Sequence, residues 1–377
     1  MASVRVANGI DTEGIYQLVR RSFSTFANYS LSDFQELTTY IYHENPARSE
    51  EHVFGWVVED ADRIVGFLGL FPLSFNVEGQ KVIGASGTMW CIDPDFQSYG
   101  LFLYKRYIDW GEDHLLIDSS SSLAANKIHE GTKLGMARVW SEGLAEKLYW
   151  VLDYRNAAAC WLDRVYRDPH SQNSRYRSFR PLLETGVTTL LRIRDVLLRS
   201  TPRIPCDVLL KEIIQFDQNE VDNLLRRTCH QAPITLSRKH DFLNWRLTSS
   251  PKRLGKNFLI GCFRGPALLG YIAVRVPKQD GDGVYRVVDL YYDLAESDVA
   301  RYLVSYVRTL ATQRRGAFLE MKGFSSVVLD GLRQTSPIRT KAKVWPYWHN
   351  KFCERRGLTN GSDGWWTSGI DGDANIF

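Results

Sequence analysis

The sequence lacks every pattern that marks a protein held together by disulfides or zinc. Its six cysteines are spread over 377 residues, and the two nearest neighbours, Cys206 and Cys229, are 23 positions apart. No Cys-x-x-Cys pair occurs, which argues against a structural zinc site. Scattered thiols in apolar runs are typical of buried free cysteines in a reducing compartment. We therefore expect a cytoplasmic protein that holds no metal.

Long apolar runs are missing as well. No apolar run reaches the ~18 residues that a membrane-spanning helix requires, and the first residues contain no signal-peptide core. We therefore expect no membrane insertion. The net charge is only +4, and no basic run carries interleaved aromatic residues. Nucleic acid is thus not an expected partner, whereas an anionic small molecule such as a nucleotide is.

Strand-like and helix-like patterns alternate along both halves of the chain. Apolar patterning predicts strands at 3–7, 52–59, 63–77, 80–92 and 115–118, helices at 10–24, 31–43, 101–114 and 123–134, and a last extended stretch at 137–154. A similar order returns after residue 207 without residue identity. We predict an α/β (α+β) protein with two similar domains, at 1–155 and 206–377, each a mixed, mostly antiparallel sheet flanked by helices. A connecting segment at 156–205 joins them.

The most informative stretch runs from Ile92 to Phe102, where a predicted strand turns into a predicted helix. A helix N-terminus leaves backbone N–H groups without partners and carries partial positive charge. Gly100 has no Cβ, so the backbone there comes close to a bound anion. The turn therefore predicts a site for a phosphate or a pyrophosphate.

This turn resembles the acyl-CoA pyrophosphate loop of the GNAT N-acyltransferase superfamily, whose pattern is Gln/Arg-x-x-Gly-x-Gly/Ala. Gln97 and Gly100 match that pattern, whereas Phe102 stands where a small residue is usual. The segment from Asn126 to Met136 resembles a second motif of the family, Asn…Lys-x-Gly-Phe. The resemblance implies an acyl-CoA site made by Trp90, Cys91, Ile92, Gln97, Ser98, Tyr99, Gly100, Leu101, Phe102 and Asn126.

The resemblance also implies attack of a neutral amine on a thioester. That step uses a proton acceptor, a donor for the oxyanion and an acid for the leaving thiolate. A tyrosine is common at one position in the family, but Gly131 stands there. His129, two residues away, and Asp118, on a predicted strand, are therefore the candidate catalytic residues, with a backbone N–H near Trp90 to Ile92 as oxyanion donor. The competing interpretations are a solvated histidine and a carboxylate that pairs with a nearby cation or caps the next helix.

The second half lacks a comparable anion loop. The corresponding turn, 293–298, holds three carboxylates and no glycine, which would repel a pyrophosphate. Only the first half is therefore expected to bind acyl-CoA. The motif at 242–246, Phe-Leu-Asn-Trp-Arg, resembles that of sugar-nucleotide N-acyltransferases, which are tandem GNAT proteins of polysaccharide and lipopolysaccharide synthesis.

A nucleotide-linked amino sugar, such as a dTDP-3-amino-3,6-dideoxyhexose, would then accept the acyl group. Aromatic side chains would stack on its base and cations would bind its diphosphate. The candidate acceptor-binding residues are Asn244, Arg246, Lys343, Trp345 and Tyr347, the last three sharing one face of a strand predicted at 338–347. The competing interpretations are a helix with Trp245 in the core and an exposed cationic strand.

Two other functions stay open at this point. An aminoacyl-tRNA-dependent transferase of the FemAB kind has a tandem GNAT-like fold but would need a larger basic surface. A non-catalytic binding protein would use the same fold without the chemistry. The sequence is compatible with a homodimer and does not indicate one.

Overall fold

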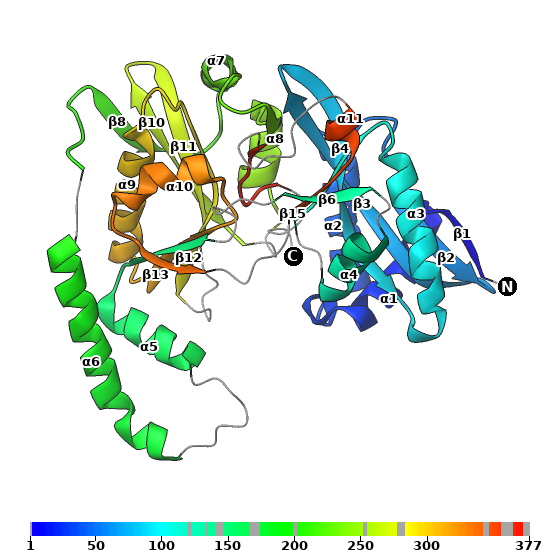
Figure 1. Ribbon diagram of the computed structural model, residues 1–377, viewed down its shortest axis with the longest axis horizontal. Helices are drawn as coiled ribbons and strands as arrows, with labels where there is room; N and C mark the ends of the chain where they lie inside the picture. The colour runs from blue at the N-terminus through cyan, green and yellow to red at the C-terminus, as the bar shows by residue number, and fades with distance from the viewer. Residues whose placement is uncertain are drawn as a thin grey trace. The chain divides into compact units, whose positions relative to one another are not determined.

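The computed structural model describes residues 2–119, 122–132, 135–139, 146–165, 174–198, 202–251, 255–276, 283–341, 347–355 and 365–371. The chain forms two compact units: unit 1 is Met1–Ser141, Cys229–Leu254 and Val344–Phe377, and unit 2 is Glu142–Thr228 and Gly255–Lys343 (Figure 1). Each unit is built on one mixed sheet flanked by helices, which confirms the predicted α+β class with two sheets. The division joins segments that were expected in different halves of the chain.

The sheet of unit 1 follows the order β1-β2-β3-β4-β5-β15-β6, and β9 and β16 extend it beside β3. All neighbours are antiparallel except the pairs β4–β5 and β9–β16. The strands are β1 (Ser3–Val6), β2 (Gly55–Asp60), β3 (Arg63–Val77), β4 (Gln80–Ile92), β5 (Leu115–Asp118), β6 (Met136–Val139), β9 (Ile234–Leu236), β15 (Tyr347–Asn350) and β16 (Trp365–Trp366).

The helices of unit 1 include α1 (Thr12–Ser22), α2 (Leu31–Thr38), α3 (Gly100–Trp110), α4 (Leu123–Thr132), α8 (His240–Leu243) and α11 (Phe352–Arg355). Single turns of π-helix extend α2 (Thr39–His43) and α8 (Asn244–Thr248), and a 3-10 helix (Pro94–Tyr99) joins β4 to α3. The apolar face of α3 packs on the sheet, where Leu103 and Tyr104 meet Leu68 and Leu116 in one buried cluster. This packing fixes the start of α3 beside the end of β4.

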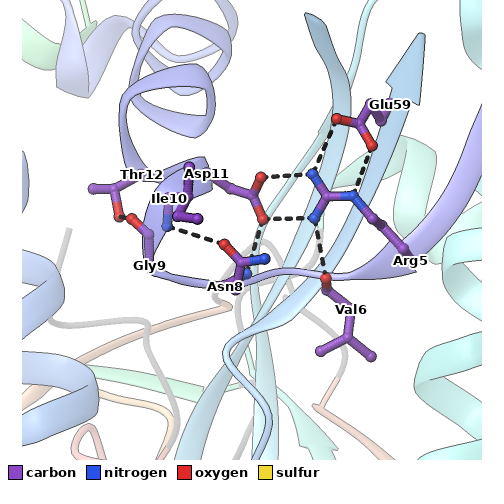
Figure 2. A network of polar contacts seen from close by, with 8 residues as sticks. All are labelled: Arg5, Val6, Asn8, Gly9, Ile10, Asp11, Thr12 and Glu59. Carbon is purple, nitrogen blue, oxygen red and sulfur yellow. Dashed lines mark hydrogen bonds and ion pairs between the residues drawn. The ribbon is translucent and has the colours of Figure 1, made fainter. Parts of the chain in front are cut away.

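One arginine on β1 connects β2 to the turn before α1 (Figure 2). Arg5 on β1 donates to both carboxylate oxygens of Glu59 on β2, at 2.7 and 3.1 Å, and to both of Asp11, at 2.7 and 2.8 Å. Asp11 also accepts the backbone N–H of Asn8, so it forms a capping box before α1. Although burial opposes it, pairing with Arg5 lowers the pKa of Asp11. The network therefore holds α1 against the edge of the sheet.

The sheet of unit 2 follows the order β14-β7-β13-β12-β11-β10-β8, with only β12 and β13 parallel. Its strands are β7 (Glu146–Val151), β8 (Val208–Glu212), β10 (Asn257–Arg264), β11 (Ala267–Arg275), β12 (Val284–Tyr292), β13 (Phe318–Lys322) and β14 (Ile338–Lys341). Its helices are α5 (Tyr154–Val165), α6 (Ser174–Leu198), α7 (Gln218–Thr228), α9 (Val299–Gln313) and α10 (Ser326–Arg333). The segment expected to connect two domains, with a helix at 182–199, contributes most of α5 and all of α6, which pack on each other (Figure 1).

Two stretches that were predicted as single extended elements each divide between the units. The stretch 137–154 gives β6 in unit 1 and β7 in unit 2, and 338–347 gives β14 in unit 2 and β15 in unit 1. As a result, β7 lies between β13 and β14, whereas β15 lies between β5 and β6. Period-two patterning shows that a segment is extended but not which sheet it joins. The two described ends of the strand predicted at 338–347 therefore join different sheets, and residues 342–346 lie outside the described residues.

Candidate active site

A cavity of about 590 Å³ opens in unit 1 beside the end of β4. Its walls come from Thr88 to Ile92 on β4, from the start of α3, from α4 and from the turn that follows α1. Most of the lining is apolar, and its polar side chains are few. A largely apolar cavity with a small number of converging polar groups is the usual form of a small-molecule site.

The edge of β4 that faces this cavity is exposed by an irregularity in the sheet. The pairing with β3 passes from Phe67↔Cys91 to Gly69↔Thr88, so Met89 and Trp90 together oppose a single residue, Leu68. Met89 has a φ of +51°, a strained value for a residue with a Cβ. Such a bulge bends the strand and redirects its side chains and N–H groups.

On its other side β4 parts from β5. The described register runs only from Gly84↔Leu115 to Ser86↔Ile117. Beyond it the hydroxyl of Tyr107 lies between the strands, where it accepts the N–H of Gly87 at 3.2 Å and donates to the carbonyl of Ile117 at 3.0 Å. The tyrosine thus holds the two strands apart at the mouth of the cavity.

Thr88 gives this wall a hydroxyl that is available to a ligand. The residue is 2% exposed and lines the cavity. Among the residues that the structure describes, none forms a hydrogen bond with its Oγ1. A buried hydroxyl without a partner costs about 1–3 kcal/mol, so a ligand group that pairs with it regains that energy.

The second wall is the N-terminus of α3. No side chain caps this 11-residue helix, and Gln97 and Gly100 line the cavity there. Gly100 has an ordinary helical φ of −55°, so its role is not to permit an unusual backbone conformation. A Cβ at this position would lie 3.2 Å from Ile92 Cδ1, and it would also narrow the approach to the helix N-terminus. The N–H of Gly100 donates to the carbonyl of Gln97 within the preceding 3-10 helix. Anion binding at this helix start stays a prediction.

The loop before α3 is held in place by a buried carboxylate. Asp93 accepts two hydrogen bonds from Arg21, both at 2.8 Å, and one from Arg63. Its own N–H donates to the carbonyl of Val65 at 2.8 Å. This anchorage fixes the angle at which the chain leaves β4 and enters α3.

Three side chains form a hydrogen-bonded chain at the base of the cavity. His129 Nε2 lies 3.0 Å from Asp118 Oδ2, and His129 Nδ1 lies 3.0 Å from Tyr104 Oη. A carboxylate only accepts hydrogen bonds, so Nε2 carries the proton and Nδ1 is left to accept the hydroxyl of Tyr104. All three residues line the cavity, and none is more than 8% exposed.

The environment of Tyr104 keeps its hydroxyl protonated. Burial raises the pKa of Tyr104, and the negative charge of Asp118 raises it further. Its ring stacks on Trp90 with an interplanar angle of 7° and centroids 5.6 Å apart. Cys91, nearby on β4, is no nucleophile, because burial raises the pKa of its thiol to about 12.

The structure gathers half of the predicted cofactor-binding residues around the cavity: Trp90, Cys91, Ile92, Gln97 and Gly100. The other five, Ser98, Tyr99, Leu101, Phe102 and Asn126, are not part of its lining. Leu101 and Phe102 are exposed on the outer side of α3. The ring centre of Phe102 lies 5.8 Å from that of Tyr99, the residue before α3, and Phe102 is not part of the cavity lining.

Of the five predicted acceptor-binding residues, the structure describes Asn244, Arg246 and Tyr347. Arg246 is buried in unit 1, with its guanidinium 5.4 Å from the ring centre of Phe71. The ring of its neighbour Trp245 stacks on that of Tyr40, with the ring centres 4.6 Å apart. The motif at 242–246, which includes Asn244, thus packs in the core. Lys343 and Trp345 lie outside the described residues. Tyr347 begins β15, where its backbone pairs with Val139.

Several lining residues were missed by the sequence interpretation. Tyr104 stands four residues after Gly100, one helical turn along the same face, so its proximity was readable from the spacing. Thr88 and Tyr107 gave no such signal, because their roles depend on the bulge and on the parting of two strands. Phe23 and Phe26 come from a turn distant in sequence and complete the apolar wall.

No protein-family model and no curated protein sequence matches this chain. Two crystal structures share its fold. One is a conserved protein of unknown function from Enterococcus faecalis V583, described as a probable N-acyltransferase, with 12% identity and a TM-score of 0.55. The other is a GCN5-related N-acetyltransferase from Anabaena variabilis ATCC 29413, with 11% identity and a TM-score of 0.54. Both alignments cover 93% of this chain and 72% of the other.

The chain has the fold of these GNAT-like structures. At such low identity the likeness establishes the fold alone. Within the part of the chain that the structure describes, no three His, Cys, Asp or Glu side chains gather as a metal site would require. Nor does any helix in those residues have the length and apolar character to cross a bilayer.

Proposed function

We propose that the protein transfers an acyl group from acyl-CoA to an amine in the cavity of unit 1. One observation carries this proposal: the Asp118–His129–Tyr104 chain and the uncapped start of α3 line the same cavity. An anion site beside a proton relay is what an acyl-CoA thioester and an ammonium group together require.

The features of the cavity fit acyl-CoA at both ends. The N–H groups at the start of α3 would hold its pyrophosphate, and Gly100 leaves room for the phosphate oxygens. The bulged edge of β4 and the hydroxyl of Thr88 offer donors beyond it. The apolar lining excludes water from the thioester, which supplies the activated acyl group.

The hydrogen-bonded chain would move one proton from the amine and back to the leaving sulfur. Tyr104 Oη accepts the proton of the amine while its own proton passes to His129 Nδ1. Asp118 stabilises the imidazolium that results. The same path then runs in reverse and protonates the thiolate. Backbone N–H groups of the β4 edge, near Trp90 to Ile92, would stabilise the oxyanion.

The nucleotide-linked amino sugar stays our proposed acceptor, for surface polysaccharide synthesis in the cytoplasm. The support for this acceptor is the sequence resemblance at 242–246. The structure adds nothing to it, because Arg246 is buried and Lys343 lies outside the described residues. Cytoplasmic residence is supported by the sequence, whose cysteines are scattered without the close spacing of a disulfide framework.

The test is titration with coenzyme A followed by a thiol-release assay with acetyl-CoA and longer acyl-CoAs. The amine panel contains dTDP-linked and UDP-linked amino sugars together with simple amines. Binding of coenzyme A and release of thiol that depends on the amine would support the proposal. Absence of binding would overturn it. Binding without turnover on any amine would favour a non-catalytic protein of the same fold.

A further inference from the structure

Helix α6 exposes its apolar side chains to solvent. Phe179, Leu182, Leu183, Leu190, Ile193 and Leu197 have exposures of 37–76%. At about 100° per residue these positions fall on a single stripe about 100° wide. The helix has 25 residues, which corresponds to a length of about 37 Å. The stripe on α6 is therefore a continuous exposed apolar surface.

The side of α6 that faces the rest of unit 2 mixes apolar and charged groups, and Leu191 packs there against a buried cluster. Arg180 pairs there with Asp163 of α5 and with Glu184. Asp195 is buried and accepts hydrogen bonds from Tyr154 and Arg194. The exposed stripe on α6 is therefore apolar surface in addition to the side that packs on unit 2. Exposed apolar surface of this kind indicates an apolar partner outside the chain.

The same two helices hold the excess charge of the protein. Helices α5 and α6 contain seven arginines and three acidic residues, a difference of +4. The whole chain also has a net charge of +4, so its remaining residues sum to zero. An exposed tryptophan, Trp161, lies on α5, and Arg155 and Arg192 are exposed as well. Exposed apolar side chains and a net positive charge are thus both found on the pair α5 and α6, which pack on each other.

We propose that the stripe on α6 binds the surface of an anionic membrane, with the helix lying in the interface. Apolar side chains would enter the boundary between headgroups and acyl chains, and the arginines would bind acidic headgroups. A second copy of this chain is the weaker candidate, because two hairpins of charge +4 would repel each other. Peripheral binding of this kind needs no membrane-spanning helix.

The experiment is co-sedimentation of the full chain with vesicles of phosphatidylcholine mixed with phosphatidylglycerol. We expect binding that weakens as salt rises, and much weaker binding to phosphatidylcholine alone. The variant L190S/I193S/L197S should lower the affinity by at least about 30-fold. The charge variant R155E/R192E should lower it for the anionic vesicles while leaving the stripe intact.

The matched control is I10S/L209S/I214S, which removes three exposed apolar side chains away from α5 and α6. It should bind anionic vesicles as the unchanged protein does. Because all substituted side chains are exposed, thermal unfolding should confirm that each variant is folded. Absence of vesicle binding at low salt would overturn the proposal, as would equal losses in the stripe variant and the control. A dimer in solution that L190S/I193S/L197S dissociates, without vesicle binding, would assign the stripe to a second copy instead.

Discussion

His129 Nε2 lies 3.0 Å from Asp118 Oδ2, and the imidazole is 3% exposed. The pair joins the end of a strand to a helix that follows it. Because Tyr104 binds the second ring nitrogen, the proposed mechanism has the histidine act on a substrate through the tyrosine. This arrangement determines which substitutions separate chemistry from binding.

Replacement of the buried pair should remove catalysis without removing the ligand. We expect Asp118→Asn and His129→Gln each to reduce kcat by about 10²–10⁴, because proton transfer is lost. The dissociation constant for coenzyme A, measured by calorimetry, should change little. The double variant should be no slower than the worse single variant, since both residues serve one relay. Unchanged turnover in either single variant would contradict the assignment.

A single substitution can remove the hydroxyl of Tyr104 and keep its aromatic ring. Tyr104→Phe keeps the stacking on Trp90 but breaks the hydrogen bond to His129. We expect kcat to fall by about 10²–10³ while KM for acyl-CoA stays within a factor of a few. The pH dependence of kcat should also change, because the ionising group loses its contact with the substrate. A fall in thermal stability with an unchanged pH profile would point to a purely structural tyrosine.

A substitution at Gly100 that adds negative charge and bulk tests the proposed anion site at the start of α3. Gly100→Glu should abolish coenzyme A binding, because the carboxylate would occupy the place of the pyrophosphate. Gly131→Glu is the matched control, since a Cβ there meets nothing within 4 Å and the residue is exposed on α4. Calorimetry should show intact binding for that control. Equal affinities in both variants would refute the site.

Thr88 offers a test in which stability and affinity change in opposite directions. Thr88→Val removes a buried hydroxyl that lacks a hydrogen-bond partner in the described residues. We expect the free energy of unfolding of the ligand-free protein to rise by about 1 kcal/mol. Affinity for acyl-CoA or for the amine should fall, because the ligand loses a partner. Urea unfolding and calorimetry measure the two effects, and a variant with lower stability and unchanged affinity would contradict the prediction.

A buried histidine should make the stability of unit 1 depend on pH. Burial lowers the pKa of His349, whose Nδ1 donates to the carbonyl of Asn350 at 2.7 Å. In the unfolded chain this group binds a proton below about pH 6.5, whereas in the folded chain it stays neutral to lower pH. Stability is therefore complete above about pH 6.5 and falls as the pH drops toward the folded pKa. The variant His349→Asn keeps a hydrogen-bond donor but does not titrate. Urea unfolding should therefore show a smaller loss of stability in this variant as the pH falls.

The local elements were largely readable from the sequence, whereas their partners were not. The bounds of β3 and β4 agree with the predicted 63–77 and 80–92, because apolar alternation and turn residues act locally. The acidic turn at 293–298 and the helix start at Gly100 were likewise visible. The sheets that β7 and β15 join were not readable from the sequence, since they depend on pairings between residues far apart in the chain.

The candidate site was predictable only in part for the same reason. His129 and Asp118 were named because their types suit proton transfer, and the structure places them in contact. Their catalytic roles stay a prediction until turnover is measured. Arg246 was chosen for its charge, but the core of unit 1 surrounds it. Pattern alone does not distinguish a buried arginine from one that meets a ligand.

The position of β15 between β5 and β6 has a consequence for synthesis of the chain. The residue pairs Ile117↔His349 and Asp118↔Trp348 span more than half of the sequence. At about 5–20 residues per second, roughly 10–50 seconds separate the two strands of such a pair at the ribosome. Throughout that interval the edge of β5 lacks its native neighbour β15. That edge includes Asp118, a residue of the proposed relay. The first unit therefore matures last, and a chain truncated before residue 347 has no route to a finished sheet around its cavity.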